Sequence, residues 1–233
     1  MSGPLQAALA PIARPASWHN AAAIRRRNRR FDRGVGVERL PVPVISIGNL
    51  SVGGTGKTPV VQWTARRLAA RGLRPAIALR GYASGGEPAA SDEAREHAEA
   101  VPEALVLADP RRAEAVRAAL GRGERIDAVV LDDGFQHRRL ARDLDVALID
   151  ARAGTLADRV LPAGWLREPA SGLRRAGAIV VTHADGVDAG LAAAIEGVAG
   201  RPPTAWTRHA WTGLRTWAAG AVPTPETAGA ARV

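Results

Sequence analysis

The sequence predicts an α/β protein with a doubly wound, mostly parallel sheet. Its 233 residues suit one sizeable domain, and 46% of them are apolar, which is enough for a packed core. Short segments that are apolar throughout alternate with helical segments along most of the chain, as is typical of a parallel sheet covered by helices on both faces. A glycine-rich turn follows the first apolar segment, and such turns bind phosphate groups at helix N-termini.

The expected strands and helices alternate along the chain. Apolar strands are expected over residues 42–48, 74–80, 104–108, 126–133, 144–151 and 177–185. Between them lie an amphipathic helix that Gly72 closes, a polar helix that begins near Asp92, and a third helix before the fourth strand. These helices are expected over residues 58–72, from 91 onward and over 110–123.

The chain divides into three parts by composition. Residues 1–40 form a short basic helical arm, residues 41–200 hold the core, and residues 201–233 form a tail rich in Pro, Thr, Ala and Trp. In the arm, Pro11 and Pro15 interrupt short apolar patches, so we expect one or two short helices in place of a long one. A dense group of arginines follows, made up of Arg25, Arg26, Arg27, Arg29, Arg30 and Arg33.

The composition narrows the classes of function. With 32 basic and 23 acidic residues the chain has a formal charge of +9, which indicates anionic partners such as phosphorylated small molecules, membranes or nucleic acid. It has no cysteine, so disulfides and thiolate metal sites are excluded. No apolar run approaches the ~20 residues of a membrane-spanning helix, and the first residues lack the pattern of a signal peptide. We therefore expect a cytosolic protein without a transmembrane segment.

A glycine-rich segment, "SVGGTGKT", lies between the first expected strand and the first expected helix. It matches the phosphate-loop pattern G-x-x-x-x-G-K-[ST], except that Ser51 stands in the place of the first glycine. The single lysine of the chain, Lys57, falls where that pattern requires lysine, because a compact ammonium reaches the β- and γ-phosphates better than a planar guanidinium does. Unless the segment is only a glycine-rich turn without a ligand, it binds ATP through Ser51, Val52, Gly53, Gly54, Thr55, Gly56, Lys57 and Thr58.

A phosphate loop needs a carboxylate partner for its metal ion, and the sequence offers one. Asp132 and Asp133 end an apolar strand, and a cation there would relieve the repulsion between two adjacent carboxylates. We expect these two side chains and the hydroxyl of Thr58 to hold Mg²⁺, the alternative being a pair of solvated turn acids. The segment "THAD" has His183 in place of the lysine of an N-K-x-D guanine reader, which favours ATP over GTP.

Longer segments carry a resemblance to a known family. The chain contains "GNLSVGGTGKTP" and "LDDGFQHRRLARDLDVALIDA", together with "RGY", "SDE" and "LPAGWLREP" in the family's order. Over roughly residues 40–185 it thus resembles the tetraacyldisaccharide 4′-kinases of lipid A biosynthesis. The resemblance implies transfer of the ATP γ-phosphate to the 4′-hydroxyl of a tetraacyldisaccharide 1-phosphate. It also implies a peripheral protein at the cytoplasmic face of the inner membrane, with an anionic membrane surface as a partner of the arginine-rich arm.

The resemblance implies catalytic roles for Lys57 and for Asp92, which would help to deprotonate the sugar hydroxyl, with Glu93 near the metal ion. The family's pattern at this point is G-D-E-P, and this chain has Ser91 and Ala94 at the outer positions. Asp92 and Glu93 would equally suit the start of a helix, where acidic side chains stabilise the N-terminus.

The resemblance further implies a set of residues that line the site or contact the headgroup of the substrate. These residues are Arg80, Tyr82, His137, Arg167 and Glu168. Two simpler interpretations stay open, namely a surface location for His137 just past a strand and a weak local ion pair between Arg167 and Glu168.

Members of the family continue beyond the point where this chain ends, so we expect residues 201–233 to begin a C-terminal domain that the chain lacks. Three alternatives to the lipid kinase stay open. They are a non-catalytic nucleotide-binding remnant, a phosphate-loop kinase or ATPase with a soluble substrate, and a nucleic-acid-binding ATPase. The sequence disfavours nucleic acid as a partner, because only Trp18 and Phe31 supply aromatic rings among the arginines of the arm.

Overall fold

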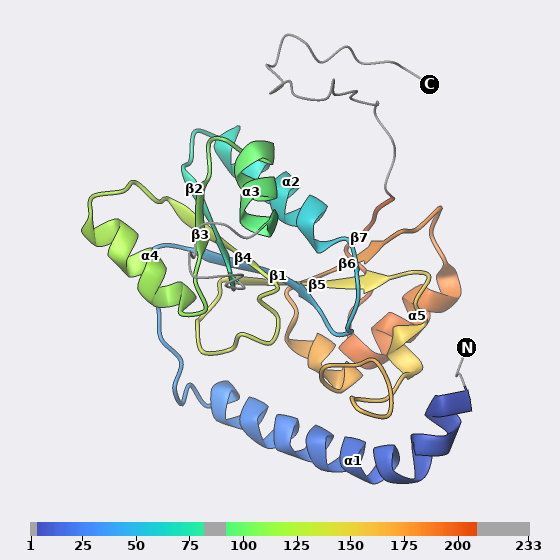
Figure 1. Ribbon diagram of the computed structural model, residues 1–233. Helices are drawn as coiled ribbons and strands as arrows, with labels where there is room; N and C mark the ends of the chain where they lie inside the picture. The colour runs from blue at the N-terminus through green and yellow to red at the C-terminus, as the bar shows by residue number, and fades with distance from the viewer. Residues whose placement is uncertain (1–3, 82–91, 209–233) are drawn as a thin grey trace, which may run out of the picture.

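The computed structural model describes residues 4–81 and 92–208 of the 233. Its centre is a seven-stranded sheet with the order β3-β2-β4-β1-β5-β6-β7, in which every neighbouring pair is parallel (Figure 1). The strands are β1 (Val44–Asn49), β2 (Pro75–Leu79), β3 (Leu105–Ala108), β4 (Ala128–Asp132), β5 (Leu144–Asp150), β6 (Ala178–Thr182) and β7 (Ala205–Trp206). The predicted fold class and the six predicted strands are confirmed, and β7 continues the sheet past Gly200.

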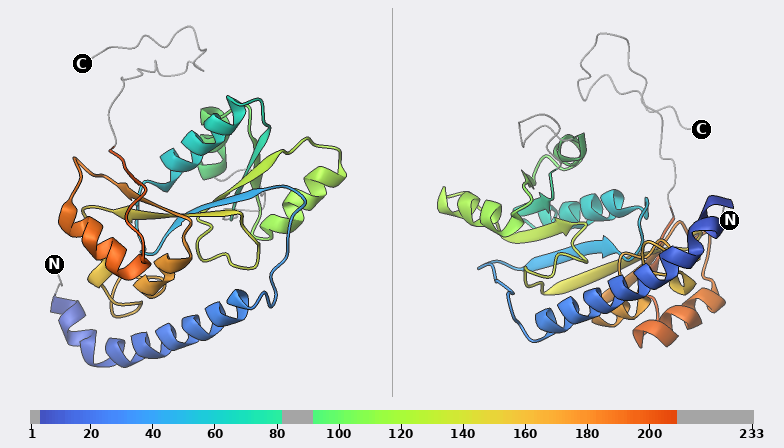
Figure 2. Two further views of the ribbon diagram at one scale, coloured as in Figure 1. Left: turned by 180° about the vertical axis from the view of Figure 1, so that it is seen from behind. Right: turned by 60° about the horizontal axis from the view of Figure 1, so that its bottom comes forward.

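Helices cover both faces of this sheet (Figure 2). They are α1 (Pro4–Asp32), α2 (Lys57–Ala69), α3 (Asp92–Ala100), α4 (Arg112–Gly121) and α5 (Ala189–Ala199), with two 3₁₀ helices, η2 (Thr155–Ala157) and η3 (Ala170–Arg175). One face packs against α2 through Val61, and against the end of α3. The opposite face packs against α4 through Val116, and against α1, η3 and α5 through Ile24, Leu173 and Ile195. The sheet therefore lies between two layers of helices, as the apolar strands predicted.

The prediction that Pro11 and Pro15 restrict the arm to short helices is wrong, because α1 is one helix of 29 residues. The helix bends near its N-terminal end, where the two prolines lie (Figure 1). Contacts with a distant segment stabilise it beyond the prolines: Ser17 Oγ donates to the carbonyl of Val160 (2.6 Å) and Asn20 Nδ2 to that of Leu161 (2.8 Å). Tertiary contacts thus outweigh the local cost of proline, ~3 kcal/mol each.

The docked side of α1 follows a spacing of three and four residues. Ser17, Ala21 and Ile24 are buried along it, and Asn28 and Phe31 are half-buried farther on. The arginines of the arm occupy the remaining positions, so the helix is basic on its outer side and packed on its inner side. Within the described residues no helix is long and apolar enough to span a membrane.

Two glycines allow the turn after β4 to pack directly on β1. A Cβ atom at Gly134 would lie 2.6 Å from Ser46 Oγ, and one at Gly48 would lie 2.6 Å from the backbone nitrogen of Phe135. The amide of Gly134 also donates to the carbonyl of Ile47 (2.9 Å). This close approach brings the residues that follow β4 against the end of β1, where the glycine-rich loop begins.

Candidate functional site

The residues predicted for the site come together at the carboxyl ends of neighbouring strands. β1 lies between β4 and β5 at the centre of the sheet, and ligands in open parallel sheets bind beyond the carboxyl ends of such strands. The glycine-rich loop leaves β1, Asp132 is the last residue of β4 with Asp133 directly after it, and His183 follows β6. The order of the strands therefore places segments that are far apart in sequence around one site.

The glycine-rich loop is held at both ends. At its start Ser51 is buried and forms an isolated antiparallel bridge with Leu166, while the amide of Val52 donates to the carbonyl of Trp165 (2.8 Å). At its end Gly56 caps α2 with a positive φ of 71°, a conformation that glycine adopts without strain. Serine is accommodated in place of the usual first glycine because Ser51 has extended pairing and no positive φ.

Lys57 stands at the first turn of α2 between two acceptors. Its Nζ lies 3.3 Å from Asn49 Oδ1 and 3.7 Å from Asp133 Oδ1. The other carboxylate oxygen of Asp133 accepts a hydrogen bond from Arg167 Nη1 at 2.6 Å. Asp133 adopts a positive φ of 49°, which is uncommon for a residue other than glycine and typical of functional positions. The structure thus brings Lys57, Asp133 and Arg167 together, and Arg167 pairs with Asp133 and not with Glu168.

Asp132 has a partner that the sequence analysis missed. His97, fully buried on α3, has Nε2 2.8 Å from Asp132 Oδ2. Because a carboxylate oxygen accepts hydrogen bonds, the tautomer with its proton on Nε2 satisfies this contact by donating a hydrogen bond to Asp132 Oδ2. The pattern that would have indicated this pair is a lone histidine on the apolar side of a polar helix, between the buried Ala94 and Val101.

Glu93 lies one helical turn before His97, and its carboxyl group responds to the acids of β4. Partial burial raises the pKa of Glu93, and the charge of Asp132 raises it further. Asp133 also contributes to this shift, and the location of Glu93 near a metal ion stays a prediction. Asp92 begins α3 as an exposed side chain, and Tyr82 and Ser91 lie outside the described residues.

A pocket of about 350 Å³ opens beside Asp133. It is lined by Arg80, Pro110, Arg112, Asp133, Gln136, His137 and Arg167. Burial, together with the charges of Arg112 and Arg142, lowers the pKa of His137 to about 4, so this ring is neutral near pH 7. Arg112 is a second residue that the sequence analysis missed. Its Nη1 donates to the carbonyl of Asp133 (3.4 Å), and the residue as a whole is 4% exposed.

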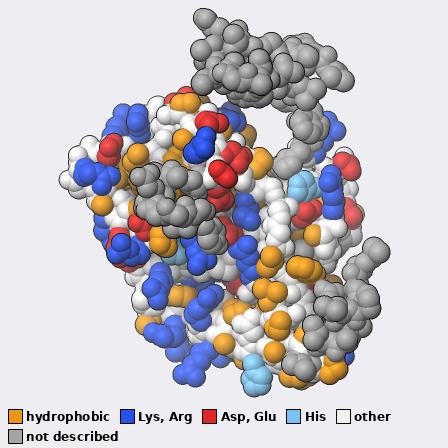
Figure 3. Space-filling model, in the orientation of Figure 1, with side chains coloured by type: hydrophobic (Ala, Val, Ile, Leu, Met, Phe, Trp, Pro, Cys, Tyr) orange, Lys and Arg blue, Asp and Glu red, His pale blue; other side chains and the backbone are white. Residues whose placement is uncertain are grey.

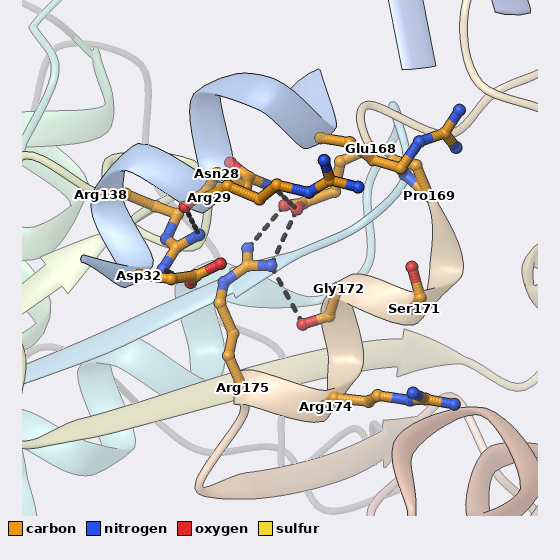
Figure 4. Close-up of a pocket in the computed structure, with 11 residues that line it drawn as sticks. Asn28, Arg29, Asp32, Arg138, Glu168, Pro169, Ser171, Gly172, Arg174 and Arg175 are labelled. Atoms are coloured by element: carbon orange, nitrogen blue, oxygen red, sulfur yellow. Dashed lines mark hydrogen bonds and ion pairs between the residues drawn. The ribbon is translucent and has the colours of Figure 1, made fainter. Parts of the chain in front are cut away.

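Glu168 does not line that pocket. It is almost fully buried, at 1% exposure, and lines a different pocket of about 240 Å³ between α1 and η3 (Figure 4). Its Oε1 accepts from Arg175 (2.6 Å) and Gln136 (2.9 Å), and its Oε2 accepts from Arg175 (2.8 Å) and Asn28 (3.1 Å). The guanidinium of Arg175 also stacks on the ring of Phe135, 3.7 Å from its centre. Glu168 therefore joins α1, η3 and the turn after β4, and leaves its neighbour Arg167 facing Asp133.

The acids at the end of β4 suit a magnesium ion. Asp132 Oδ1 and Asp133 Oδ1 are buried oxygens without a hydrogen-bond partner among the described residues. Mg²⁺ prefers oxygen ligands and is commonly bound by one or two carboxylates together with the phosphates of a nucleotide. No larger group of His, Asp and Glu that resembles a metal site occurs in the described part of the chain.

The fold and this site define a class: an α/β protein with a phosphate loop at the centre of a doubly wound parallel sheet. The model of the family described as "Tetraacyldisaccharide-1-P 4'-kinase" matches residues 9–227, and the chain belongs to this family. The predicted resemblance is thereby confirmed.

Individual relatives agree with this assignment. The chain is 39% identical over 212 residues to "Tetraacyldisaccharide 4'-kinase" of Chlorobium luteolum, covering 81% of this chain and 60% of that protein. It is 45% identical over 219 residues to the protein of the same name in Anaeromyxobacter dehalogenans strain 2CP-C, covering 85% and 57%. The chain thus spans less than two thirds of the length of these relatives.

A solved structure is also similar. The crystal structure of "apo" form LpxK from Aquifex aeolicus, in complex with ATP, superimposes with a TM-score of 0.68 at 28% sequence identity. The match covers 88% of this chain and 82% of that one.

Proposed function

We propose that the protein is an ATP-dependent kinase that transfers the γ-phosphate to the 4′-hydroxyl of a tetraacyldisaccharide 1-phosphate. The observation that carries the proposal is the cluster of Lys57, Asp133 and Arg167 at the end of the phosphate loop, with separations of 3.7 and 2.6 Å. In this cluster a mobile ammonium faces the position of the β- and γ-phosphates, and a carboxylate is held by a guanidinium beside it. The ATP bound in the similar Aquifex aeolicus structure supports the choice of nucleotide.

In the proposed site, residues 51–58 cradle the phosphates of ATP with backbone N–H groups, and Lys57 contacts the β- and γ-phosphates. Thr58, Asp132 and Asp133 would hold Mg²⁺, with Glu93 nearby, and the ion would supply positive charge beside the phosphate oxygens. His97 fixes the orientation of Asp132, and Arg167 that of Asp133.

The transfer step follows from these positions. The 4′-oxygen of the sugar attacks the γ-phosphorus, the bond to the β,γ-bridging oxygen breaks, and ADP leaves. Asp92, at the exposed start of α3, accepts the proton of the attacking hydroxyl. Arg80, Tyr82, His137 and Arg167 would contact the substrate. The buried Glu168 acts by positioning Arg167 and not by contact.

The substrate is a lipid, so we propose that the protein works at the cytoplasmic face of the inner membrane as a peripheral protein. The arginine-rich side of α1 would contact anionic headgroups, each basic residue contributing ~1 kcal/mol near the surface. Nucleic acid is not proposed as a partner. A second candidate function is nucleotide binding without transfer by this chain alone, because the match covers only 57–60% of the curated relatives.

Transfer of labelled γ-phosphate from ATP to a tetraacyldisaccharide 1-phosphate in mixed micelles tests both candidates. Lys57→Ala removes the ammonium, Lys57→Arg keeps its charge but not its shape, and Arg71→Gln is an exposed control in the turn that follows α2. Labelled lipid that disappears with both Lys57 variants, and not with the control, supports the kinase. ATP binding that depends on Lys57 without any transfer supports the second candidate. ATP binding that is indifferent to Lys57 contradicts both.

A further inference from the structure

A carbonyl group inside the phosphate loop is held by a side chain from a distant strand. Thr182, the last residue of β6, donates a hydrogen bond from Oγ1 to the carbonyl of Thr55 at 2.9 Å, across 127 residues of sequence. Thr182 is 1% exposed and Thr55 is 3% exposed, whereas the preceding residues 52–54 are exposed. Thr55 is therefore a fixed point in a loop whose neighbouring residues face solvent.

The sheet brings Thr182 to this position. β5 lies between β1 and β6, so the loop that leaves β1 has to cross the end of β5 to reach Thr182. Side chains alternate along a strand, and Val180 packs in the same apolar cluster as Val61 of α2, so Thr182 points to that face as well. The contact thus lies on the face that α2 covers. Basic side chains gather over the C-terminal half of α1 (Figure 3), which packs on the opposite face.

The side chain of Thr182 is itself well fixed. Thr182 pairs with Asp150 in the register of β5 and β6, and its carbonyl accepts a hydrogen bond from the amide of Ala151 (2.9 Å). A β-branched side chain on a strand has few rotamers, so a rigid backbone also fixes the direction of the hydroxyl. Thr182 can therefore hold a mobile loop in place.

The direction of the Thr55 carbonyl decides the direction of the next amide. The peptide bond between Thr55 and Gly56 is trans, and in a planar trans peptide the C=O and the N–H point to opposite sides. A donor that holds the carbonyl toward β6 therefore turns the N–H of Gly56 away from β6. Inward-pointing N–H groups of such loops are the groups that bind phosphate oxygens.

Other contacts do not account for this arrangement. Oγ1 of Thr182 also lies 3.3 Å from the carbonyl of Ile149, but a hydroxyl carries one proton, and the contact with Thr55 is the shorter one. The hydroxyl of Thr55 is buried without a hydrogen-bond partner among the described residues, so it does not hold the loop. A buried carbonyl without a donor costs free energy, so the carbonyl of Thr55 depends on Thr182.

We propose that Thr182 is a positioning residue for phosphate binding, whose hydroxyl holds the peptide between Thr55 and Gly56 so that the N–H of Gly56 faces the phosphates of ATP. The inference rests on the proposed function, because it requires that the loop bind ATP. It also gives a role to the segment "THAD", whose first residue contacts the loop through its side chain. A loop held in its binding conformation loses less conformational freedom when the nucleotide binds, so the contact raises the affinity.

Titration calorimetry of the 233-residue chain with ATP and with tripolyphosphate, both in Mg²⁺, tests the proposal. Thr182→Val keeps the shape of the side chain without its hydroxyl, and Thr182→Ser keeps the hydroxyl. The matched control is Thr207→Val, because the hydroxyl of Thr207 donates to the carbonyl of Val181 in β6 (3.3 Å) and not to the loop. We expect Thr182→Val to bind both ligands roughly 10-fold more weakly, and the other two variants to stay within about twofold of the parent.

A measurement without ligand tests the same contact independently of binding. The NMR order parameters of the amides of Gly54 and Gly56 should fall in Thr182→Val, because the loop has lost its fixed point, and should be unchanged in Thr207→Val. If Thr182→Val does not fold, Thr182→Ala takes its place with the same expectations.

Four results overturn the proposal. They are unchanged order parameters in Thr182→Val, an unchanged affinity in that variant, an affinity that Thr182→Ser does not restore, and a loss of affinity for ATP but not for tripolyphosphate, which carries the phosphates alone. Lys57→Ala is measured alongside. An affinity for ATP that is indifferent to Lys57→Ala contradicts the proposed function, whereas the order parameters decide about Thr182 in either case.

Discussion

At the scale of single residues, the site depends on side chains that hold other side chains. Asp132 and Asp133 stand next to each other at the end of β4, yet each has its own support: His97 for the first, and Arg167 with Lys57 for the second. The two carboxylates are therefore fixed in different directions. This arrangement suits acids that must present free oxygens to a cation and not pair with each other.

Replacing His97 tests whether this support matters for the metal. His97→Leu fills the same space but leaves Asp132 without its donor, so we expect Mg²⁺-dependent ATP affinity to fall roughly 10-fold or more. His97→Gln keeps a donor and should retain most of the affinity. Binding of ATP in the presence of a chelator should be the same in all three proteins. If the leucine variant needs no more Mg²⁺ than the parent, His97 serves only to fill the core.

His137 gives the stability of the protein a dependence on pH. Its pKa is about 4 in the folded chain, because of burial and of the charges of Arg112, Arg142 and Arg139, against which Glu38 acts weakly. Between about pH 6.5 and 4 the unfolded chain takes up a proton at this ring and the folded chain does not. The free energy of unfolding therefore falls as the pH falls through this window, by at most ~1.4 kcal/mol per pH unit.

Urea unfolding of His137→Asn between pH 4 and 7 measures this contribution. The difference in stability between variant and parent should grow in favour of the variant as the pH is lowered. If the free energy of unfolding depends on pH in the same way for His137→Asn and for the parent, the ring of His137 titrates alike in the folded and the unfolded chain, and the prediction is wrong.

At the scale of elements, α1 is joined to the sheet through a buried charge. Glu168 accepts four hydrogen bonds that link α1, η3 and the turn after β4, and removing one member of a buried charged network leaves the others unpaired. We expect Glu168→Ala to lower the free energy of unfolding by about 3–5 kcal/mol. Glu124→Ala, at an exposed position, should change it by less than ~0.5 kcal/mol. Chemical denaturation checks both, and a similar small effect of the two variants would argue against the network.

The turn after β4 can pack against β1 only because Gly134 has no side chain. Gly134→Ala places a Cβ 2.6 Å from Ser46 Oγ and 2.9 Å from Leu131 Cβ, so β1 and the turn must separate. We expect a loss of about 1–3 kcal/mol in stability, together with weaker ATP binding. Gly197→Ala, within α5 and with open space around it, should instead stabilise by ~0.5–1 kcal/mol. Thermal unfolding distinguishes the two, and equal melting temperatures would show that the turn has room to adjust.

At the scale of the whole molecule, the sequence predicts what is encoded locally. Strands buried on both faces are apolar throughout, as in β2, whose five residues are all buried, and such runs are visible without a structure. The phosphate loop is visible because its glycines and lysine follow one another in a fixed pattern. The division into an arm, a core over residues 41–200 and a tail stays a prediction.

The features that the sequence analysis missed depend on contacts between residues that are distant in sequence. The length of α1 follows from contacts with Val160 and Leu161, and the role of His97 from an aspartate 35 residues away. The helix α5 is different, since its ends carry local signals that the sequence analysis passed over. Asp188 accepts a hydrogen bond from the amide of Leu191 (2.9 Å), and Gly200 closes the helix with a φ of 76°.

The position of Lys57 between Asn49 and Asp133 has a practical consequence, because it is the single lysine among the 233 residues. Reagents that modify side-chain amines therefore act at one place on this molecule, inside the phosphate loop. Reductive methylation with isotope-labelled formaldehyde keeps the positive charge and would give one side-chain resonance in an NMR spectrum. The protein thus contains, without any engineering, one side-chain reporter on what occupies its loop, separate from the resonance of the α-amine that the same reagent labels.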